Sequence, residues 1–380
     1  MVTRDIENII FNQIQPGKVI RLYGARRVGK TVLSEVLTQK LNVRTEVFNG
    51  EDFNTTRILG ERSLSNYKQL FSDTDLIVID EAQYIKDIGL ILKLIVDNLK
   101  NIAILITGSS AYNLFKETGE PLVGRSYSFK LYPFSIHEIS QFRSKTTILK
   151  YLDDFLIYGS YPEVVFLENY QEKQNYLLDI VNSYLLKDIL MIDGIKNSAK
   201  MRNLLRLIAF QSGSEVSYDE IGKQLALSRN TVEKYLDLLS QTYIIYRLPA
   251  FSKNPRKEIS KSGKWYFYDN GIRNALIGDF RPLSKRDDTG ILWENFIIAE
   301  RMKYHNNKRH HVNFYFWRSY SDQEIDLIEE YDGNITATEI KFSKKSVKCP
   351  SSFKKLYPTA DFKFINRYNL FEFIENSSTH

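Results

Sequence analysis

Cysteine pairs, long apolar runs and an apolar N-terminus are all missing from this sequence, and each absence excludes a class of protein. Cys349 is the only cysteine among 380 residues, which rules out an intramolecular disulfide and fits a reducing compartment. No segment offers the roughly 18 uninterrupted apolar residues that a membrane-spanning helix needs. Residues 1–5 carry charges where a signal peptide would need an apolar stretch. We therefore expect a cytoplasmic chain with no membrane partner.

Length and composition favour a globular chain with more than one domain. A chain of 380 residues is long for a single hydrophobic core, which predicts two or three domains. Hydrophobic residues make up 43% of the chain and charged residues 26%, as is ordinary for globular proteins. The net charge is +6, and between residues 247 and 286 ten Lys or Arg stand against three acids. Such a patch either meets phosphate groups or is a solvated face.

Residues 18–131 alternate short β-branched runs with helical patterns, which is the rhythm of a parallel α/β sheet. The first, third and fourth runs are almost continuously apolar, as expected for strands that are buried on both faces. Apolar residues at helical spacing, from Val32 to Leu41, follow the first run. The predicted strands are 19–23, 45–48, 76–79, 102–107 and 126–131. The sequence therefore predicts an α/β domain over residues 1–132.

Three further blocks follow. Apolar stripes at helical spacing predict a helical lid or linker over residues 133–211. Residues 212–287 are predicted to form a winged helix, in which Ser217 and Glu220 form a capping box and Ser228 caps the second helix. Two strand-like runs, 243–248 and 264–268, flank its basic connection. From residue 288 to 380, a helix over 291–303 precedes strands at 312–317, 324–328 and 336–342.

Residues 24–31 match the phosphate-binding pattern G-x-x-x-x-G-K-[ST], between an apolar strand and an amphipathic helix, as the motif requires. Its glycines let backbone N–H groups point at phosphate oxygens, and the helix N-terminus adds partial positive charge. Lys30 is expected to reach the β- and γ-phosphates, and the Thr31 hydroxyl is expected to ligate Mg²⁺. The motif thus predicts ATP and Mg²⁺ as cofactors. The predicted nucleotide-binding residues are Gly24, Ala25, Arg26, Arg27, Val28, Gly29, Lys30, Thr31, Val32, Asp80 and Ser109.

The strand that ends in Asp80 and Glu81 predicts the hydrolytic groups. Asp80 is expected to support Mg²⁺, and Glu81 to polarise the attacking water. Ser109 ends the next strand, where a small hydroxyl would lie between the acids and the γ-phosphate. Arg125 is a candidate cation for transition-state charge, supplied within the chain or to a neighbour. Lys30, Glu81 and Arg125 are therefore the predicted catalytic residues of this site.

The order of these motifs resembles a family of AAA+ ATPases that is widespread in archaea and bacteria and is related to the signal-transducing ATPases. This resemblance implies a P-loop AAA+ parallel sheet with a helical lid, and its relatives include both rings and monomers. A homo-oligomer or a protein partner therefore stays open. The resemblance rests on residues 24–31, 80–81, 107–110, 122–125, 131–135, 159–163, where Ser160 replaces a glycine, 229–232, Tyr235 and 266–271.

The last block, residues 288–380, contains acids and a lysine in an order that suggests a second catalytic site. Glu339 and Lys341 lie two apart on a predicted strand, so their side chains share a face. If the strand of Asp326 pairs alongside, Asp326 and Glu339 could share Mg²⁺ while Lys341 orients an attacking water. With Glu294 on the preceding helix, the set resembles the PD-(D/E)XK nuclease fold, in which Glu294, Asp326 and Glu339 would be metal ligands and Lys341 catalytic. Solvated charges on a strand face, or a silent nuclease-like fold, are the alternatives.

The predicted winged helix offers groups for DNA. Its second helix would expose the side chains of Arg229, Asn230, Thr231 and Lys234, and its wing those of Lys253, Arg256, Lys257, Lys261 and Lys264. Winged helices in such ATPases also serve as packing modules. The leading hypothesis is an ATP-hydrolysing, DNA-acting protein whose ATP state regulates the winged helix and a metal-dependent nuclease-like domain. The alternative is a nucleotide-driven switch or scaffold that recruits a protein partner and keeps a silent nuclease-like domain.

Overall fold

The computed structural model describes residues 2–109, 122–185, 198–252, 263–319 and 322–375. These residues form two compact units. Unit 1 contains residues 2–132 with 241–243, and unit 2 contains the described residues from 133 onwards apart from 241–243. The boundary that the sequence suggests after residue 132 coincides with this division, whereas those after 211 and 287 fall inside unit 2. Some residues named in the sequence predictions lie outside the described ranges: Ser110, Lys253, Arg256, Lys257 and Lys261.

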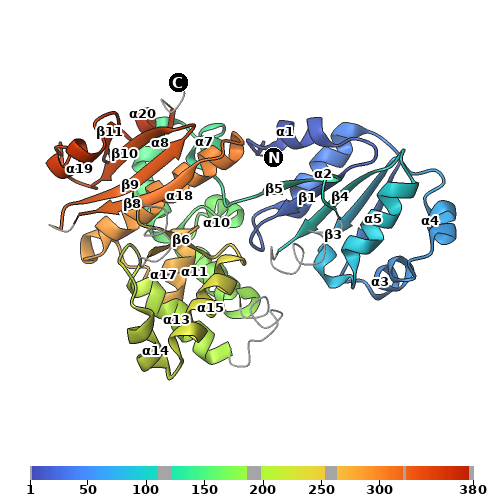
Figure 1. The fold of residues 1–380 in the computed structure, drawn as a ribbon, viewed down its shortest axis with the longest axis horizontal. Helices are drawn as coiled ribbons and strands as arrows, with labels where there is room; N and C mark the ends of the chain where they lie inside the picture. The colour runs from blue at the N-terminus through green and yellow to red at the C-terminus, as the bar shows by residue number, and fades with distance from the viewer. Residues whose placement is uncertain (1, 110–121, 186–197, 253–262, 320–321, 376–380) are drawn as a thin grey trace. The chain divides into compact units, whose positions relative to one another are not determined.

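Unit 1 is an α/β sheet of five parallel strands in the order β2-β3-β4-β1-β5, drawn with its helices in Figure 1. The parallel sheet that the sequence predicts is confirmed. Strands β1 and β4 are buried along their whole length, because both lie inside the sheet and their runs are almost continuously apolar. The elements are α1 (Glu7–Gln13), β1 (Val19–Tyr23), α2 (Lys30–Leu41), β2 (Thr45–Asn49), α3 (Phe53–Gly60), α4 (Leu64–Leu70), β3 (Leu76–Asp80), η1 (Ala82–Tyr84), α5 (Ile88–Asn98), β4 (Ala103–Gly108) and β5 (Ser126–Lys130).

Unit 2 begins with helices and continues into a small antiparallel sheet of β6 (Ile245–Leu248) and β7 (Lys264–Phe267). Ser217 accepts a hydrogen bond from the backbone N–H of Glu220, and Ser228 accepts one from that of Thr231, so both predicted helix starts are confirmed. The helices are α7 (Ile136–Ser140), α8 (Lys145–Lys150), α9 (Leu152–Tyr158), α10 (Pro162–Phe166), α11 (Tyr170–Asp179), η2 (Ile180–Leu185), α13 (Ser198–Phe210), α14 (Tyr218–Leu225), α15 (Arg229–Ser240), α17 (Asn270–Ile277) and η3 (Leu283–Lys285).

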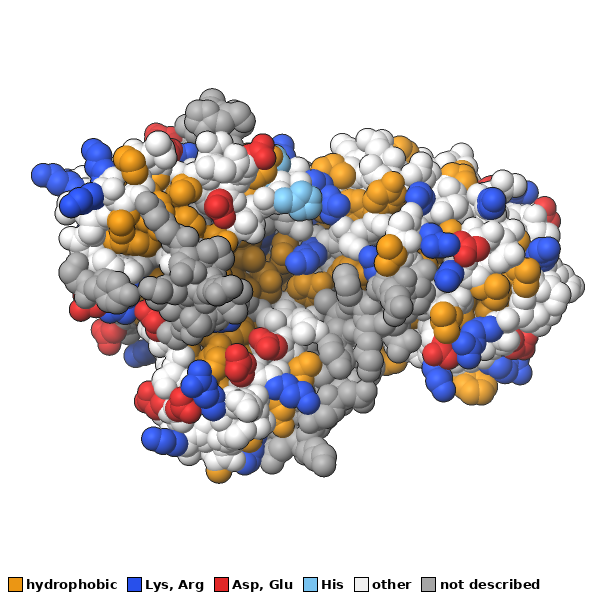
Figure 2. All heavy atoms as spheres, viewed as in Figure 1, with side chains coloured by type: hydrophobic (Ala, Val, Ile, Leu, Met, Phe, Trp, Pro, Cys, Tyr) orange, Lys and Arg blue, Asp and Glu red, His pale blue; other side chains and the backbone are white. Residues whose placement is uncertain are grey.

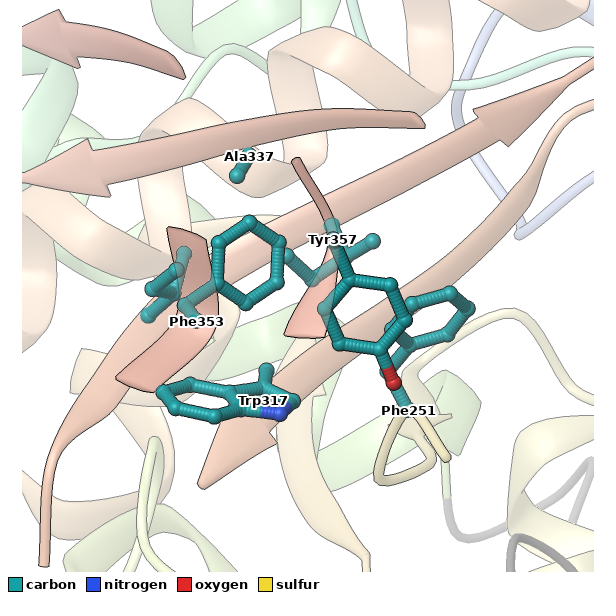
Figure 3. Close-up of a cluster of buried hydrophobic side chains, with 7 residues drawn as sticks. Phe251, Trp317, Ala337, Phe353 and Tyr357 are labelled. Carbon is teal, nitrogen blue, oxygen red and sulfur yellow. The ribbon is translucent and has the colours of Figure 1, made fainter. Parts of the chain in front are cut away.

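The C-terminal part of unit 2 is a four-stranded sheet in the order β11-β10-β9-β8. Strand β9 is antiparallel to both of its neighbours, and β11 is parallel to β10. One face of the sheet packs on helix α19 through a cluster that includes Phe251, Trp317 and Phe353, drawn in Figure 3. The elements are α18 (Thr289–Asn307), β8 (Asn313–Arg318), β9 (Glu324–Tyr331), β10 (Asn334–Ile340), α19 (Ser351–Leu356), β11 (Asp361–Ile365) and α20 (Leu370–Glu375).

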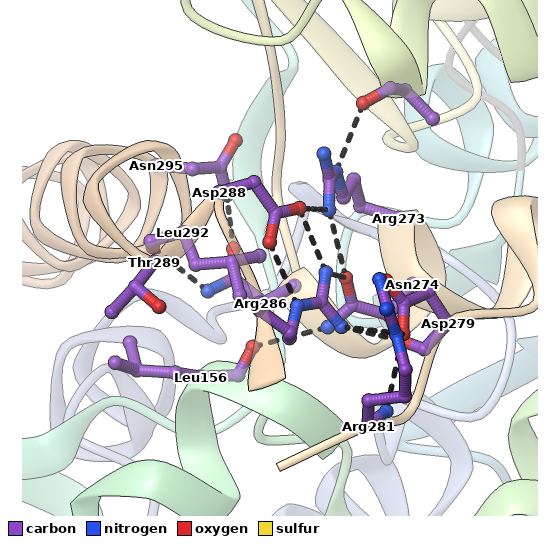
Figure 4. A network of polar contacts seen from close by, with 12 residues as sticks. Leu156, Arg273, Asn274, Asp279, Arg281, Arg286, Asp288, Thr289, Leu292 and Asn295 are labelled. Carbon is purple, nitrogen blue, oxygen red and sulfur yellow. Dashed lines mark hydrogen bonds and ion pairs between the residues drawn. The ribbon is translucent and has the colours of Figure 1, made fainter. Parts of the chain in front are cut away.

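Asp288, just before α18, is a partly buried carboxylate that pairs with two buried arginines, as Figure 4 shows. Arg286 donates to both of its carboxylate oxygens at 2.8 Å, and Arg273 donates to one of them. The Arg286 guanidinium is fully buried, and only 3% of the Arg273 side chain is exposed. Burial acts to raise the pKa of Asp288, but the two guanidinium groups outweigh it and lower the pKa to about 2.

A second buried network ties residues 133–160 to α17 and α18. The Asp269 carboxylate accepts hydrogen bonds from the backbone N–H groups of Ser160, at 2.7 Å, and Gly271, at 2.9 Å. Lys303 donates to the Ser160 hydroxyl at 3.0 Å and to the carbonyl of Phe134 at 2.9 Å. The serine at position 160 therefore supplies an acceptor that a glycine would lack.

Candidate nucleotide site and C-terminal acidic cluster

The phosphate-binding loop joins β1 to α2, as its sequence context requires. A Cβ atom at Gly24 would lie 2.2 Å from the carbonyl oxygen of Leu131, so only glycine fits there. Gly29 caps α2 at a φ of 96°, in the left-handed region that favours glycine. The buried Lys30 ammonium donates to the carbonyls of Gly24 and Ala25, both at 3.0 Å. The lysine thus lies along the loop whose N–H groups would hold phosphates.

Arg4, which the sequence did not indicate as a site residue, hydrogen-bonds to this loop. Its guanidinium is buried and donates to the carbonyls of Val28, at 2.8 Å, and Tyr132, at 2.7 Å. Arg26, within the loop, donates to the hydroxyl of Tyr84 in η1 at 2.7 Å. The role of Arg4 could not be predicted from the sequence, because an isolated arginine 20 residues before the motif belongs to no recognisable pattern.

Asp80, the last residue of β3, contacts the start of α2 directly after the phosphate-binding loop. Asp80 accepts a hydrogen bond from the Thr31 hydroxyl at 2.9 Å through one carboxylate oxygen and one from Thr107 through the other. Strand β4 lies between β1 and β3, so its carboxyl end, with Thr107 and Ser109, lies between the loop and the acids. The place of Ser109 beside a γ-phosphate stays a prediction, and Thr107 is an additional contact to Asp80.

A groove of about 370 Å³ opens between α2 and strands β2 and β3, beside Thr31 and Asp80. Ser34, Glu35 and Asn49 line it together with apolar side chains from β2 and β3. Hydroxyl and carboxylate oxygens are the groups that Mg²⁺ prefers. The Thr31 and Asp80 pair therefore fits this metal.

The structure contradicts one of the two roles predicted for Arg125. The residue directly precedes β5, where Ser126 pairs with Val19 at the beginning of β1. The phosphate-binding loop follows Tyr23 at the other end of β1, roughly 16 Å away at the usual rise of a strand. Arg125 instead donates to Asp97 at 2.6 Å. Action on the nucleotide of its own chain is therefore wrong, and only action on a neighbour's nucleotide stays a prediction.

In unit 2, three of the four predicted C-terminal residues converge. The Lys341 ammonium lies 2.8 Å from an Asp326 oxygen and 2.9 Å from a Glu339 oxygen. Burial and the Asp326 charge raise the pKa of Glu339. Burial acts to lower the pKa of Lys341, but Asp326 and Glu339 outweigh it and raise the pKa. The second Glu339 oxygen is buried and accepts no hydrogen bond from any described residue.

The fourth residue, Glu294 on α18, belongs to a neighbouring cluster that the sequence did not reveal. It accepts a hydrogen bond from Tyr266 and lies 3.5 Å from the ammonium of Lys264. Lys264 also pairs with Glu324. In the described ranges, no three His, Cys, Asp or Glu side chains are grouped so as to hold a metal, and lysines lie against these carboxylates. Metal ligation by Glu294, Asp326 and Glu339 thus stays a prediction.

The basic surface predicted for DNA is only partly available. Arg229, Asn230 and Lys234 are exposed on α15, but Arg229 lies 3.5 Å from Asp219. Lys264 is buried in the cluster with Glu294, so the prediction that it faces a DNA backbone is wrong. Figure 2 shows Lys and Arg side chains interspersed with Asp and Glu on the face drawn. No helix in the described part of the chain is long and apolar enough to cross a membrane.

Burial of Glu294 predicts a pH dependence of stability. Only 15% of its side chain is exposed, and burial raises its pKa to about 7 from 4.5, against the opposing charge of Lys264. The folded chain therefore keeps a proton that the unfolded chain loses between these values. Raising the pH from 4.5 to 7 should lower the free energy of unfolding of unit 2 by up to about 3 kcal/mol. Urea titrations at several pH values measure this loss.

Glu294→Gln should remove most of this loss, because the amide has no proton to release. Glu168→Gln, at an exposed position of the same unit, is the matched control and should leave the pH dependence as in the wild type. An unchanged slope in Glu294→Gln would contradict the assignment.

Three parts of the chain match known families. Residues 16–140 match the family described as AAA domain. Residues 149–283 match a domain of unknown function, DUF8612, and residues 289–373 match another, DUF4143.

Similar proteins cover most of the chain. An uncharacterized protein of Mycobacterium tuberculosis is 25% identical over 341 residues, which cover 89% of this chain and 73% of that protein. An uncharacterized protein of Methanocaldococcus jannaschii is 26% identical over 378 residues, with coverages of 92% and 82%.

Two solved structures are also similar. A signal-transduction ATPase with a tetratricopeptide repeat sensor from Pyrococcus horikoshii has a TM-score of 0.32 at 13% identity, covering 81% of this chain and 47% of its own. The Thermotoga maritima RuvB Holliday junction branch migration motor has a TM-score of 0.33 at 15% identity, with coverages of 65% and 90%. TM-scores this low do not establish a common overall fold. The match of residues 16–140, together with the loop and acids described above, supports an AAA+ ATPase family.

Proposed function

We propose that the chain binds ATP with Mg²⁺ in unit 1 and hydrolyses it. One observation carries the proposal: the Thr31 hydroxyl, at the start of α2, donates to Asp80 at the end of β3. This contact brings the phosphate-binding loop and the acidic strand end together at the carboxyl edge of a parallel sheet, where ligands of α/β folds bind.

Each residue of this site has a role in the proposal. Backbone N–H groups of residues 24–32 and the Lys30 ammonium hold the phosphates. Thr31 and Asp80 hold Mg²⁺, which would offset the charge that develops on the transferring phosphoryl group. Glu81 accepts a proton from the attacking water, and Ser109 lies beside it at the end of β4.

We further propose that residues 288–375 cleave DNA in a metal-dependent reaction that the ATP state regulates. The meeting of Asp326, Glu339 and Lys341 supports this second activity. The unpaired buried oxygen of Glu339 also fits a metal ligand, because a buried carboxylate oxygen without a donor is costly unless a cation binds it. The α14–α15 pair followed by β6 and β7 has the order of a winged helix, and its exposed Arg229 and Lys234 would contact DNA.

A rival function uses the same nucleotide site. In this case ATP binding and hydrolysis switch unit 2 between states that recruit a protein partner or a second copy, and the nuclease-like part is silent. The lysines that lie against Glu294 and Asp326 favour this rival, since they already neutralise the carboxylates.

Cleavage of plasmid and linear DNA by the purified chain tests the proposal, with Mg²⁺ or Mn²⁺ and with or without ATP. We expect ATP-dependent cleavage by the wild type. Lys30→Ala should lose nucleotide binding and with it the ATP dependence. Glu339→Ala should lower cleavage at least about 100-fold and leave ATP turnover intact, because the two sites lie in different units.

Lys68→Ala, at an exposed position, is the matched control for Lys30→Ala, and Glu330→Ala, at a partly exposed position, is the control for Glu339→Ala. Both control variants should hydrolyse ATP and cleave DNA as the wild type does. Full ATP turnover without any cleavage would sink the nuclease proposal and favour the switch. Absence of ATP turnover in the wild type would sink the ATPase proposal itself.

A further inference from the structure

The carboxylate of Glu81 is held by a neighbouring amide. Gln83, in η1, donates a hydrogen bond from its side-chain Nε2 to Glu81 Oε2 and a second one, at 3.2 Å, to the Ser109 hydroxyl. A carboxylate can only accept hydrogen bonds, so the nitrogen of the amide must face Glu81. The two N–H groups of one amide thus join the end of β4 to the acid at the end of β3.

The backbone of Glu81 is fixed independently of its side chain. Its N–H donates to the Thr107 hydroxyl at 3.1 Å, and its φ of 50° lies in the left-handed region, where a non-glycine residue is strained. With the backbone held by Thr107, the direction of the carboxylate depends on the side-chain torsions alone. Gln83 is the described residue whose side chain restrains those torsions.

This arrangement has an energetic cost that packing alone does not explain. The Oε1 atom of Gln83 is buried and accepts no hydrogen bond from the described residues. A buried acceptor without a partner costs about 1–3 kcal/mol. Unsatisfied buried groups in native structures are few, and a role at a reactive site is one of their recognised explanations.

We propose that Gln83 is the positioning residue of Glu81: its amide, anchored on Ser109, holds the carboxylate in the direction from which it accepts the proton of the attacking water. The inference rests on the proposed ATPase function. Gln83 touches neither ATP nor water in this scheme and acts through Glu81. Its loss should therefore affect turnover and not nucleotide affinity.

Gln83→Leu tests this role, because leucine has a similar size and no hydrogen-bonding group. We expect kcat for ATP hydrolysis to fall about 10- to 100-fold, since misdirected catalytic groups cost this much, with KM within about twofold of the wild type. In a Glu81→Gln background the same substitution should change the residual turnover, followed with radiolabelled ATP, by less than about twofold. Gln69→Leu, at an exposed position of the same unit, should retain the wild-type kcat.

The outcomes separate the positioning role from the ATPase function. A wild-type kcat in Gln83→Leu, while Glu81→Gln is inactive, overturns the positioning role alone. An equal fall of kcat in the wild-type and Glu81→Gln backgrounds also overturns it, because a purely structural effect would be additive. If the wild type binds ATP and does not hydrolyse it, the ATPase function fails, and the positioning role fails with it.

Discussion

Glu81→Gln is expected to bind ATP with the affinity of the wild type and to hydrolyse it at least about 100-fold more slowly. The reason is that the amide keeps the size and the polar contacts of the side chain and cannot accept a proton from water, and general bases contribute about 10²- to 10⁴-fold to rates. Binding of a fluorescent ATP analogue and release of phosphate under single-turnover conditions measure the two quantities separately.

Glu46→Gln, at an exposed position of β2, is the matched control and should hydrolyse ATP as the wild type does. Equal rates for Glu81→Gln and the wild type would remove Glu81 from the reaction. Loss of ATP binding in Glu81→Gln would instead mean that the substitution disturbs the phosphate-binding loop.

Asp288→Asn is expected to lower the free energy of unfolding of unit 2 by about 3–5 kcal/mol. It removes the negative charge from a carboxylate that pairs with the buried guanidinium groups of Arg273 and Arg286, and an uncompensated buried charge costs this much. Because the pKa of Asp288 is lowered to about 2, its contribution is present above pH 3.8 and is lost as the pH falls towards 2. Denaturant titrations at pH 7 and pH 3 measure both effects.

Asp287→Asn, at the exposed neighbouring position, should change the stability by less than about 0.5 kcal/mol. The difference between the two variants at pH 7 should shrink on acidification. If both variants lose the same small amount, the pairing seen in Figure 4 contributes little to stability.

Much of unit 1 could be predicted because its buried strands are recognisable as short, mostly apolar runs. Apolar residues dominate the runs that form β1 and β4, with Arg21 and Thr107 as exceptions, and the limits of both strands were predicted within one residue. The order of strands in the sheet is set by pairing between distant segments, which no local pattern reveals. For this reason the sequence could not place Arg125 at the end of β5 away from the phosphate-binding loop.

In the candidate sites, too, local motifs could be predicted and contacts between distant segments could not. The loop follows from a motif with a fixed spacing and Asp80 from the apolar strand before it, whereas the direct contact of Asp80 with Thr31 was not predicted. Arg4 and Gln83 reach the site through the fold, and each is an ordinary residue in its local sequence. Thr107 belongs to the segment 107–110 that carries the resemblance, but its contact with Asp80 was not predicted. Lys264 was placed in a basic wing because its neighbours are basic, but the strand pairing of β7 turns it into a buried partner of Glu294.

The network around Ser160 limits how the chain can be divided into fragments. Helix α18 supplies Lys303, which donates to Phe134 and Ser160, and Glu300, which accepts the backbone N–H of Ile136 at 2.7 Å. A truncation that ends before α18 would remove these hydrogen bonds from buried polar groups of residues 134–160. The segment from α18 to α20 is therefore not independent of residues 134–160, and recombinant pieces of unit 2 should run from residue 133 through α20 to keep their native packing.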